Sequence, residues 1–130
     1  MACVIVLDAG ALIAYLNPTD TWHEHVVELF AAHAPESLAI SELTLAECLV
    51  RPTLSGRQSD VLRVITDLQI ERVAVPVGAA DTLASLRATT SLRMRDAVVL
   101  HTAEALHAAV ATTDAALARA AEGRGIRVLV

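Results

Sequence analysis

Short runs rich in β-branched residues alternate along this chain with longer segments in which apolar residues recur at helical spacing. The short runs are expected to be strands. Strands joined through helices pair in parallel, because the long crossover returns the chain to the same edge of the sheet. The alternation therefore predicts an α/β fold with a parallel sheet covered by helices. The expected strands are Val4–Leu7, Leu38–Ile40, Arg72–Val75, Ala109–Thr112 and Arg127–Val130.

Three segments show the helical period clearly. In Ser59–Leu68 the apolar side chains share one face and the charged ones lie outside it. Thr21–Ala34 places apolar side chains from Trp22 to Phe30 on one stripe. Asp96–Leu106 is apolar on almost all sides, as expected for a helix buried at the centre of the sheet. The prolines are expected between elements; they are Pro18, Pro35, Pro52 and Pro76.

The 130 residues contain no internal repeat, no low-complexity tract and no flexible linker. A chain of this length can bury about two-thirds of its unfolded surface in one core, so we expect a single domain over residues 1–130. The apolar opening run ends at Asp8, and no apolar stretch approaches the roughly 20 residues that cross a bilayer. Cys3 and Cys48 lack metal-binding or disulfide spacing. We therefore expect a cytoplasmic protein without membrane contact.

The charge balance restricts how this chain can bind nucleic acid. The net charge is −5, and all ten basic residues are Arg. Such a chain is not a general polyanion binder, so RNA or DNA would be held by local groups of arginines, whose planar side chains grip phosphate bidentately. Hydrophobic residues make up 55% of the sequence, which favours a surface covered by another chain.

Four acidic residues stand where ligands bind in a parallel α/β sheet, beyond the carboxyl ends of the strands. Asp8 directly follows the first expected strand, and Asp114 closely follows the fourth. Glu47 and Asp96 lie near the starts of largely apolar helices. These four residues are the candidates for a common site.

Each of these acids taken alone also has a structural explanation. Asp8 and Asp114 are suited to be helix N-caps, and Thr44–Glu47 matches a capping box. Asp96 fits such an explanation less well. With Ser91 as the helix cap, Asp96 lies more than a turn inside a helix and is followed by apolar residues. A carboxylate that faces the core needs a partner.

Taken together, the four carboxylates predict a divalent cation. At one end of a sheet they would repel one another unless a cation lay among them, and oxygen ligands favour Mg²⁺ or Mn²⁺. The histidines argue against zinc, because His23 and His25 face different sides of a helix and no HExxH motif is present.

With these residues located, the chain resembles the PIN-domain nucleases, and among them the VapC toxins of toxin–antitoxin pairs. Four segments in the family's order carry the resemblance over essentially the whole chain. An Asp after a strand also opens receiver domains and haloacid-dehalogenase-type phosphatases. The phosphatases need a second Asp where this chain has Gly10, and receivers need a late Lys, which it lacks. The segments are Val4–Leu12, Ser41–Glu47, Leu92–Ala97 and Ala111–Asp114.

The resemblance implies a PIN-like fold, with a central parallel sheet of about five strands and helices on both faces. It implies that Asp8 and Asp96 are the main metal ligands, directly or through water. Asp114 and Glu47 would complete the ligand and catalytic set. Thr112 matches a frequent hydroxyl position of the family, although a threonine that merely ends a strand explains it equally well. The implied activity is that of a metal-dependent endoribonuclease toxin, which hydrolyses structured cellular RNA with a metal-activated water.

An acidic pocket needs nearby cations to hold RNA. Arg51, Arg93 and Arg95 are the candidates, because they are close in sequence to Glu47 and Asp96. Arg93 and Arg95 point to different sides of a helix, so at least one is expected to be an ordinary surface charge. The aromatic residues are at core-like positions, which favours recognition of RNA shape and backbone over base reading. They are Tyr15, Trp22 and Phe30.

The resemblance also implies two protein partners, a small VapB-like antitoxin and a second copy of the chain in a homodimer. The expected antitoxin surface lies on Ala11–Leu16, Thr21–Ala34 and Ser59–Leu68. Two other functions remain open at this point. One is a different metal-dependent phosphoryl-transfer hydrolase on a related α/β sheet, and the other is a PIN-like fold kept only as a binding module.

Overall fold

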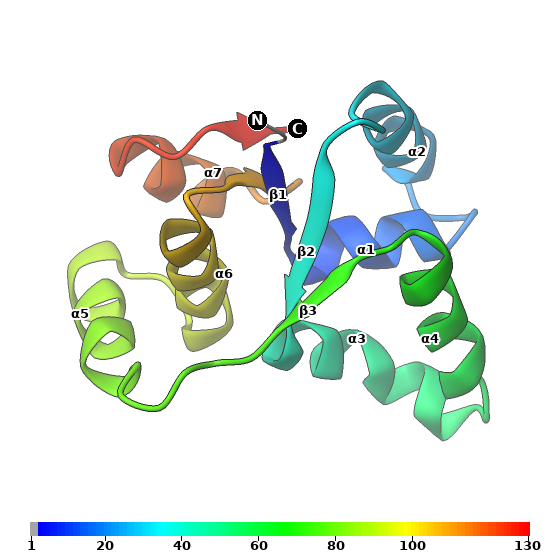
Figure 1. Ribbon diagram of the computed structural model, residues 1–130, viewed down its shortest axis with the longest axis horizontal. Coiled ribbons are helices and arrows are strands. Elements are labelled where there is room, and N and C mark those ends of the chain that lie inside the picture. The colour runs from blue at the N-terminus through cyan, green and yellow to red at the C-terminus, as the bar shows by residue number, and fades with distance from the viewer. Residues whose placement is uncertain (1–2) are drawn as a thin grey trace.

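The computed structural model describes residues 3–130, in which one or two helices separate each strand from the next (Figure 1). The strands are β1 (Val4–Leu7), β2 (Ser37–Ser41), β3 (Glu71–Val73), β4 (Ala109–Ala111) and β5 (Val128–Leu129). The helices are α1 (Ala9–Leu16), α2 (His23–Ala32), α3 (Glu42–Leu54), α4 (Gln58–Asp67), α5 (Ala80–Thr90), α6 (Met94–Leu106) and α7 (Ala115–Gly123).

The strands form one sheet in the order β3-β2-β1-β4-β5, and every pairing is parallel. In the registers of the central strand β1, Val4 lies opposite Ser37 of β2 and Ile5 lies opposite Ala109 of β4. The predicted α/β class with a parallel sheet is confirmed. Because all strands run in the same direction, the residues that follow β1, β2 and β4 emerge at one edge of the sheet.

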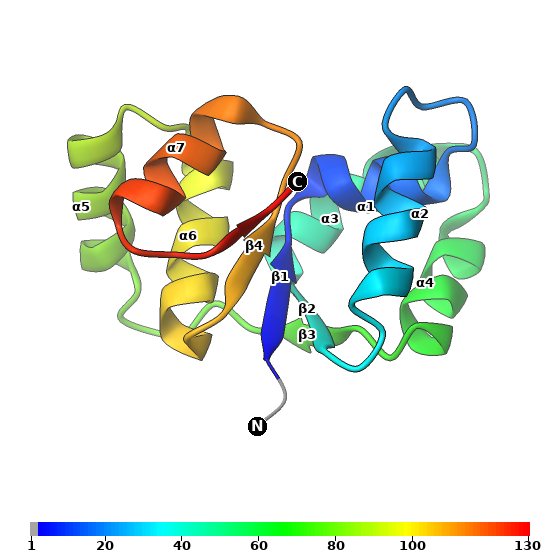
Figure 2. The ribbon, with the colours of Figure 1, turned by 90° about the horizontal axis from the view of Figure 1, so that it is seen from above.

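Helices cover both faces of the sheet. Figure 2 shows α1, α2 and α4 on one side and α5, α6 and α7 on the other. Successive side chains of β1 point to opposite faces. Ile5 and Leu7 join a core with Leu45 of α3, whereas Val6 joins the other core with Leu100 of α6. Burying each such side chain contributes roughly 1.5–3 kcal/mol, so the two cores hold the helices in place on both faces.

Helix α6 packs against β1, β2 and β4, across the middle of the sheet. Its residues from Ala97 to Leu100 are all buried, which confirms the predicted buried apolar helix. Helix α5 packs beside α6. The sequence does not show a clear apolar stripe for α5, because only Leu83 and Leu86 of this helix are buried.

The remaining expectations differ from the structure in detail. Most predicted bounds are off by one or two residues. Pro52 was expected between elements, but it lies near the end of α3, where the missing N–H removes only one intrahelical bond. Trp22 was expected in the core, but it is 42% exposed, whereas Tyr15 and Phe30 stack with ring centroids 4.8 Å apart. No helix within residues 3–130 is both long and apolar enough to cross a membrane.

Candidate active site

Four carboxylates that are far apart in the sequence line one cleft at the carboxyl end of the sheet. The cleft has a volume of about 440 Å³. The structure brings together all four acids that the sequence singled out. They are Asp8 after β1, Glu47 on α3, Asp96 on α6 and Asp114 before α7.

Asp8 is buried, and both of its carboxylate oxygens accept hydrogen bonds. Its Oδ1 accepts from the backbone N–H of Ala11 at 2.7 Å and so caps α1. Its Oδ2 accepts from the hydroxyl of Thr112. The capping role proposed as a structural explanation is therefore real, and the same carboxyl group also lines the cleft.

Thr112 connects Asp8 to a second acid of the cleft. Its hydroxyl oxygen accepts a hydrogen bond from the backbone N–H of Asp114 at 3.0 Å. Asp114 in turn caps α7, because its Oδ1 accepts from the N–H groups of Ala116 and Leu117 at 2.8 and 3.1 Å. Thr112 thus does more than end a strand, since it bonds to the carboxylate of Asp8 and to the backbone of Asp114.

Glu47 lies in the second turn of α3, on another wall of the cleft. The capping-box interpretation of Thr44–Glu47 is wrong, because the helix begins earlier and Ser41 caps it by accepting a hydrogen bond from the N–H of Leu43 at 3.3 Å. The Glu47 carboxylate lies 3.9 Å from the guanidinium of Arg95. Both side chains are exposed, so this contact is weak and leaves Glu47 accessible.

Asp96 lies in the first turn of α6, and Arg93 is the residue that precedes the helix. The expectation that Ser91 caps this helix and that Asp96 lies more than a turn inside it is wrong. Ser91 ends α5 instead, in a left-handed conformation with φ of 59°. Asp96 is half-buried and lines the cleft, so its carboxylate does not face the core.

The cleft has a negative electrostatic environment. Burial raises the pKa of Asp8 above its ordinary value of 3.8, and hydrogen bonds from Thr112 and Ala11 oppose this rise. The charges of Asp114 and Asp96 raise it further. Charges in a partly buried site are screened less than charges in open solvent, so Asp8 shares one electrostatic environment with the other two carboxylates.

Two neutral side chains of α3 lie next to the acids. Burial raises the pKa of the Cys48 thiol to about 12, so this cysteine is a neutral packing residue. Thr44 lines the cleft, and its hydroxyl is buried without a hydrogen-bond partner among residues 3–130. Sequence reasoning gave Thr44 only a capping role. The signal it missed is that Thr44 lies three residues before Glu47, and therefore on the same helix face.

The three candidate arginines are placed differently. Arg95 lines the acidic cleft. Arg93 is exposed just before α6 and lies outside the cleft lining. Arg51 lines a separate groove between α3 and α4, together with Val61 and Val64. Of the three, only Arg95 therefore lines the cleft that holds the four carboxylates.

The side chains of the cleft fit a hard divalent cation, because they offer carboxylate and hydroxyl oxygens. Among residues 3–130, no three His, Cys, Asp or Glu side chains are close enough to hold an ion by themselves. Mg²⁺ commonly binds through one or two carboxylates and keeps several water ligands. A cleft of about 440 Å³ has room for an ion with its waters, and Thr44, whose buried hydroxyl has no partner among residues 3–130, stands in its wall.

Comparisons with known proteins agree with this architecture. The solved structure of FitAB bound to an IR36 DNA fragment matches with a TM-score of 0.75 and 21% identity, covering 96% of this chain and 93% of that chain. VapBC2 from Rickettsia felis, bound to a promoter DNA fragment, matches with a TM-score of 0.70 and 16% identity, covering 97% of each chain. A toxin–antitoxin complex from Klebsiella pneumoniae matches with a TM-score of 0.68 and 18% identity, covering 85% of this chain and 86% of that chain.

At such identities these structures establish the fold alone. No curated protein is significantly similar in sequence to this chain. The sequence profile of the PIN domain, however, matches residues 5–123, which include all four acids of the cleft, the strands β2 to β4 and all of β1 except Val4. The chain belongs to the PIN domain family.

Proposed function

We propose that this protein is a metal-dependent endoribonuclease and the toxin of a toxin–antitoxin pair. The observation that carries the proposal is the convergence of four carboxylates on one cleft of a PIN domain. A module that only bound RNA would gain nothing from this arrangement, because unneutralised carboxylates repel phosphate. The same acids become useful when a cation lies among them.

Asp8, Asp96 and Asp114 would hold Mg²⁺ or Mn²⁺, directly or through water. When bound, the ion lowers the pKa of a water ligand and offsets the charge that develops on the phosphate. The hydrogen bonds of Asp8 and Asp114 hold their carboxylates in fixed orientations. Glu47 is exposed to the cleft and would take the proton of the attacking water. The products would carry a 5′-phosphate and a 3′-hydroxyl.

Arg95 would hold the phosphate next to the cleaved bond, because it is the only arginine in the cleft lining among the described residues. Replacing Arg95 by Gln should raise KM for RNA more than it lowers kcat. Arg51→Gln is the matched control, since Arg51 lies outside this cleft. Equal effects of the two substitutions on KM would show that Arg95 does not hold the phosphate.

The decisive experiment measures cleavage of total cellular RNA by the purified protein with Mg²⁺, with Mn²⁺ and with chelator. Asp96→Asn should abolish cleavage while leaving the thermal transition intact, because Asp96 is a half-buried cleft residue. Asp81→Asn is the control, since Asp81 also lies in the first turn of a helix but outside the cleft. Asp8→Asn provides a second inactive variant.

Each alternative predicts a different result. Cleavage that persists in both Asp variants would come from a contaminating ribonuclease. A wild-type protein that does not cleave RNA but hydrolyses small phosphate esters with metal would be a different phosphoryl-transfer hydrolase. A protein that binds RNA without cleaving it under any metal condition would be a binding module.

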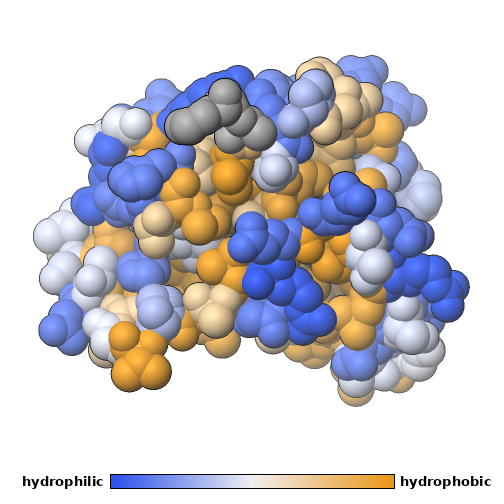
Figure 3. Space-filling model, viewed as in Figure 1, coloured by the Kyte–Doolittle hydropathy of each residue, from blue (hydrophilic) through white to orange (hydrophobic). Residues whose placement is uncertain are grey.

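The toxin role draws support from the structural relatives and from the surface. One similar structure is described as a toxin–antitoxin complex. Several large apolar side chains of this chain are exposed, including Ile13 on α1 and Val27 on α2, and hydrophobic surface (orange) is extensive in Figure 3. These helices belong to the surface expected for a small VapB-like antitoxin.

Expression in a bacterial host tests this role directly. Induction of the wild-type protein should arrest growth, and induction of Asp96→Asn should not. Co-expression of a small DNA-binding protein encoded beside this gene should restore growth and copurify with the protein. Cleavage in vitro without growth arrest would show that the protein is a ribonuclease but not a toxin.

A second copy of the chain would cover another surface, on α3. Leu43, Val50 and Leu54 are exposed on this helix and are spaced by seven and four residues, so they share one face. A stripe of large apolar side chains is more typical of an interface than of a solvent-facing helix. We therefore include a homodimer in the proposal.

A further inference from the structure

A second cleft opens beside the acidic one, between the end of α5 and the outer face of α7. Its volume is about 570 Å³. Its polar lining consists of hydroxyl and guanidinium groups from Thr89, Thr90, Ser91, Arg119 and Arg124, and it includes no acidic side chain among the described residues. A lining that holds arginine side chains and no carboxylate favours an anionic ligand, although the whole protein has a net charge of −5.

The lining residues of the two clefts are close in sequence on both walls. On one wall, Leu92 of the second cleft lies three positions before Arg95 of the acidic cleft. On the other wall, Ala116 of the second cleft lies two positions after Asp114 of the acidic cleft. Along the chain, only Arg93 and Met94 separate the two linings on the first wall, and only Ala115 separates them on the second.

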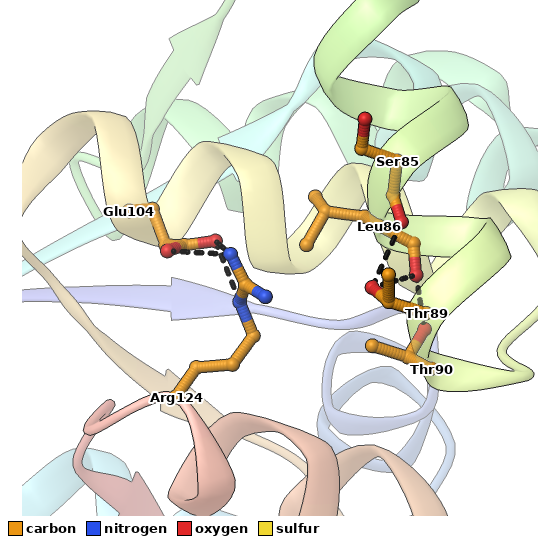
Figure 4. A network of polar contacts seen from close by, with 6 residues as sticks. All are labelled: Ser85, Leu86, Thr89, Thr90, Glu104 and Arg124. Carbon is orange, nitrogen blue, oxygen red and sulfur yellow. Dashed lines mark hydrogen bonds and ion pairs between the residues drawn. The ribbon is translucent and has the colours of Figure 1, made fainter.

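The arginines in and near the second cleft differ in whether a carboxylate already neutralises their charge. Arg124 donates two hydrogen bonds to the Glu104 carboxylate, at 3.0 and 3.1 Å (Figure 4). Arg119 is exposed and forms no ion pair with any carboxylate of residues 3–130, and the same is true of Arg93 between the clefts. The charge of Arg119 is therefore available for a phosphate, which its planar group can grip with two bonds.

The threonine hydroxyls of the second cleft already donate hydrogen bonds to backbone carbonyl oxygens. The hydroxyl of Thr89 donates to the carbonyl oxygens of Ser85 and Leu86, at 2.8 and 3.4 Å, and that of Thr90 donates to Leu86 at 2.5 Å (Figure 4). Their oxygens can therefore only accept further hydrogen bonds. Phosphate oxygens cannot donate one, whereas a ribose 2′-hydroxyl can.

We propose that this second cleft binds the ribose–phosphate backbone of the RNA strand next to the cleaved bond. Arg119 binds a phosphate, and the exposed Thr89 hydroxyl accepts a hydrogen bond from a ribose 2′-hydroxyl. The inference rests on the proposed ribonuclease function and adds to it a binding subsite that prefers RNA over DNA.

Binding is measured by fluorescence anisotropy with a labelled single-stranded RNA and with DNA of the same sequence, in an Asp96→Asn background that prevents cleavage. Arg119→Gln should weaken RNA binding about tenfold and should lower the slope of log affinity against log salt by about 0.7, the value for one lost phosphate contact. Arg63→Gln is the control, because Arg63 is also exposed without an ion pair among the described residues but lies on α4. Thr89→Val should weaken binding of RNA and leave binding of DNA unchanged.

The same substitutions in the active protein separate this inference from the proposed function. Arg119→Gln should raise KM for RNA that extends beyond the cleaved bond and leave kcat nearly unchanged. Metal-dependent cleavage with no difference between Arg119→Gln and Arg63→Gln would overturn the subsite and keep the ribonuclease. Equal loss of RNA and DNA binding in Thr89→Val would overturn the 2′-hydroxyl contact. A wild-type protein that neither binds nor cleaves RNA would overturn both proposals.

Discussion

The hydroxyl of Thr112 donates a hydrogen bond to the Oδ2 atom of Asp8, across 104 positions of the chain. This bond joins the end of β4 to the end of β1, which are neighbouring strands. Because Thr112 also accepts from the N–H of Asp114, a single hydroxyl ties together two acids of the cleft. The geometry of the candidate site thus depends on the pairing of two strands.

Thr112→Val should destabilise the fold by about 1–3 kcal/mol, because it leaves a buried carboxylate oxygen without its donor. It should also raise the pKa of Asp8 further, since the hydrogen bond from Thr112 favours the ionised form. Denaturant titration measures the first effect, and NMR titration of the Asp8 carboxyl carbon measures the second. Thr112→Ser keeps the hydroxyl and should retain most of both properties. A Val variant as stable as the wild type would contradict the importance of this bond.

Asp8→Asn should raise the melting temperature of the metal-free protein at neutral pH. Burial raises the pKa of Asp8 in the folded state, so the folded protein binds this proton more tightly than the unfolded chain does. The stability from the protonated form is present below the ordinary value of 3.8 and is lost as the pH rises through the folded-state pKa. Asn avoids this loss and is an equally good N-cap. Its NH2 group replaces the oxygen that accepts from Thr112 and can instead donate to the Thr112 hydroxyl oxygen, so the contact with Thr112 is kept with the direction of the hydrogen bond reversed.

The measurement is a series of melting curves in chelator from acidic to neutral pH. The wild type and Asp8→Asn should differ most at neutral pH and converge below pH 3.8, the ordinary pKa of this group. Added Mg²⁺ or Mn²⁺ should then stabilise the wild type by about 2.7 kcal/mol at a hundred times Kd and leave the variant unchanged. A constant difference at every pH would show that Asp8 is not the titrating group.

Thr44→Val should leave the fold as stable as before or stabilise it by about 1 kcal/mol, because it removes a buried hydroxyl that has no partner among the described residues. The same change should lower metal affinity or cleavage several-fold if the hydroxyl serves a ligand or its water. Thr102→Val is the control, since the buried Thr102 hydroxyl donates to the carbonyl of Val98 at 2.7 Å and lies outside the cleft. Unchanged activity in Thr44→Val would remove Thr44 from the site.

Val50→Glu should convert the proposed homodimer into a monomer, because it places a charge in the middle of the apolar stripe on α3. Light scattering coupled to gel filtration gives the mass of both proteins. Val77→Glu is the control, since Val77 is fully exposed in the loop before α5. A wild-type monomer at micromolar concentration would contradict the homodimer.

Much of the fold could be predicted from local patterns. The alternation of strand-like and helical segments identified all five strands, since β-branched runs and apolar periodicity report burial directly. Asp8 and Asp114 were recognised as caps for the same reason, because a cap bonds to residues only two or three positions away. Weaker patterns were ambiguous. Thr44–Glu47 looks like a capping box, yet Ser41 provides the cap, because β2 ends there and the helix starts three residues earlier.

Local patterns in the chain were thus enough to show that several acidic residues follow strands and that the fold is a parallel α/β sheet. The three-dimensional arrangement was needed to show that all four acids share one cleft, that Arg95 lines it while Arg51 lies in another groove, and that Thr112 bonds to Asp8. This division arises because a local pattern reports what a residue does within its own helix or strand. Distances between residues from different elements depend on the strand order and on the side of the sheet that each helix covers.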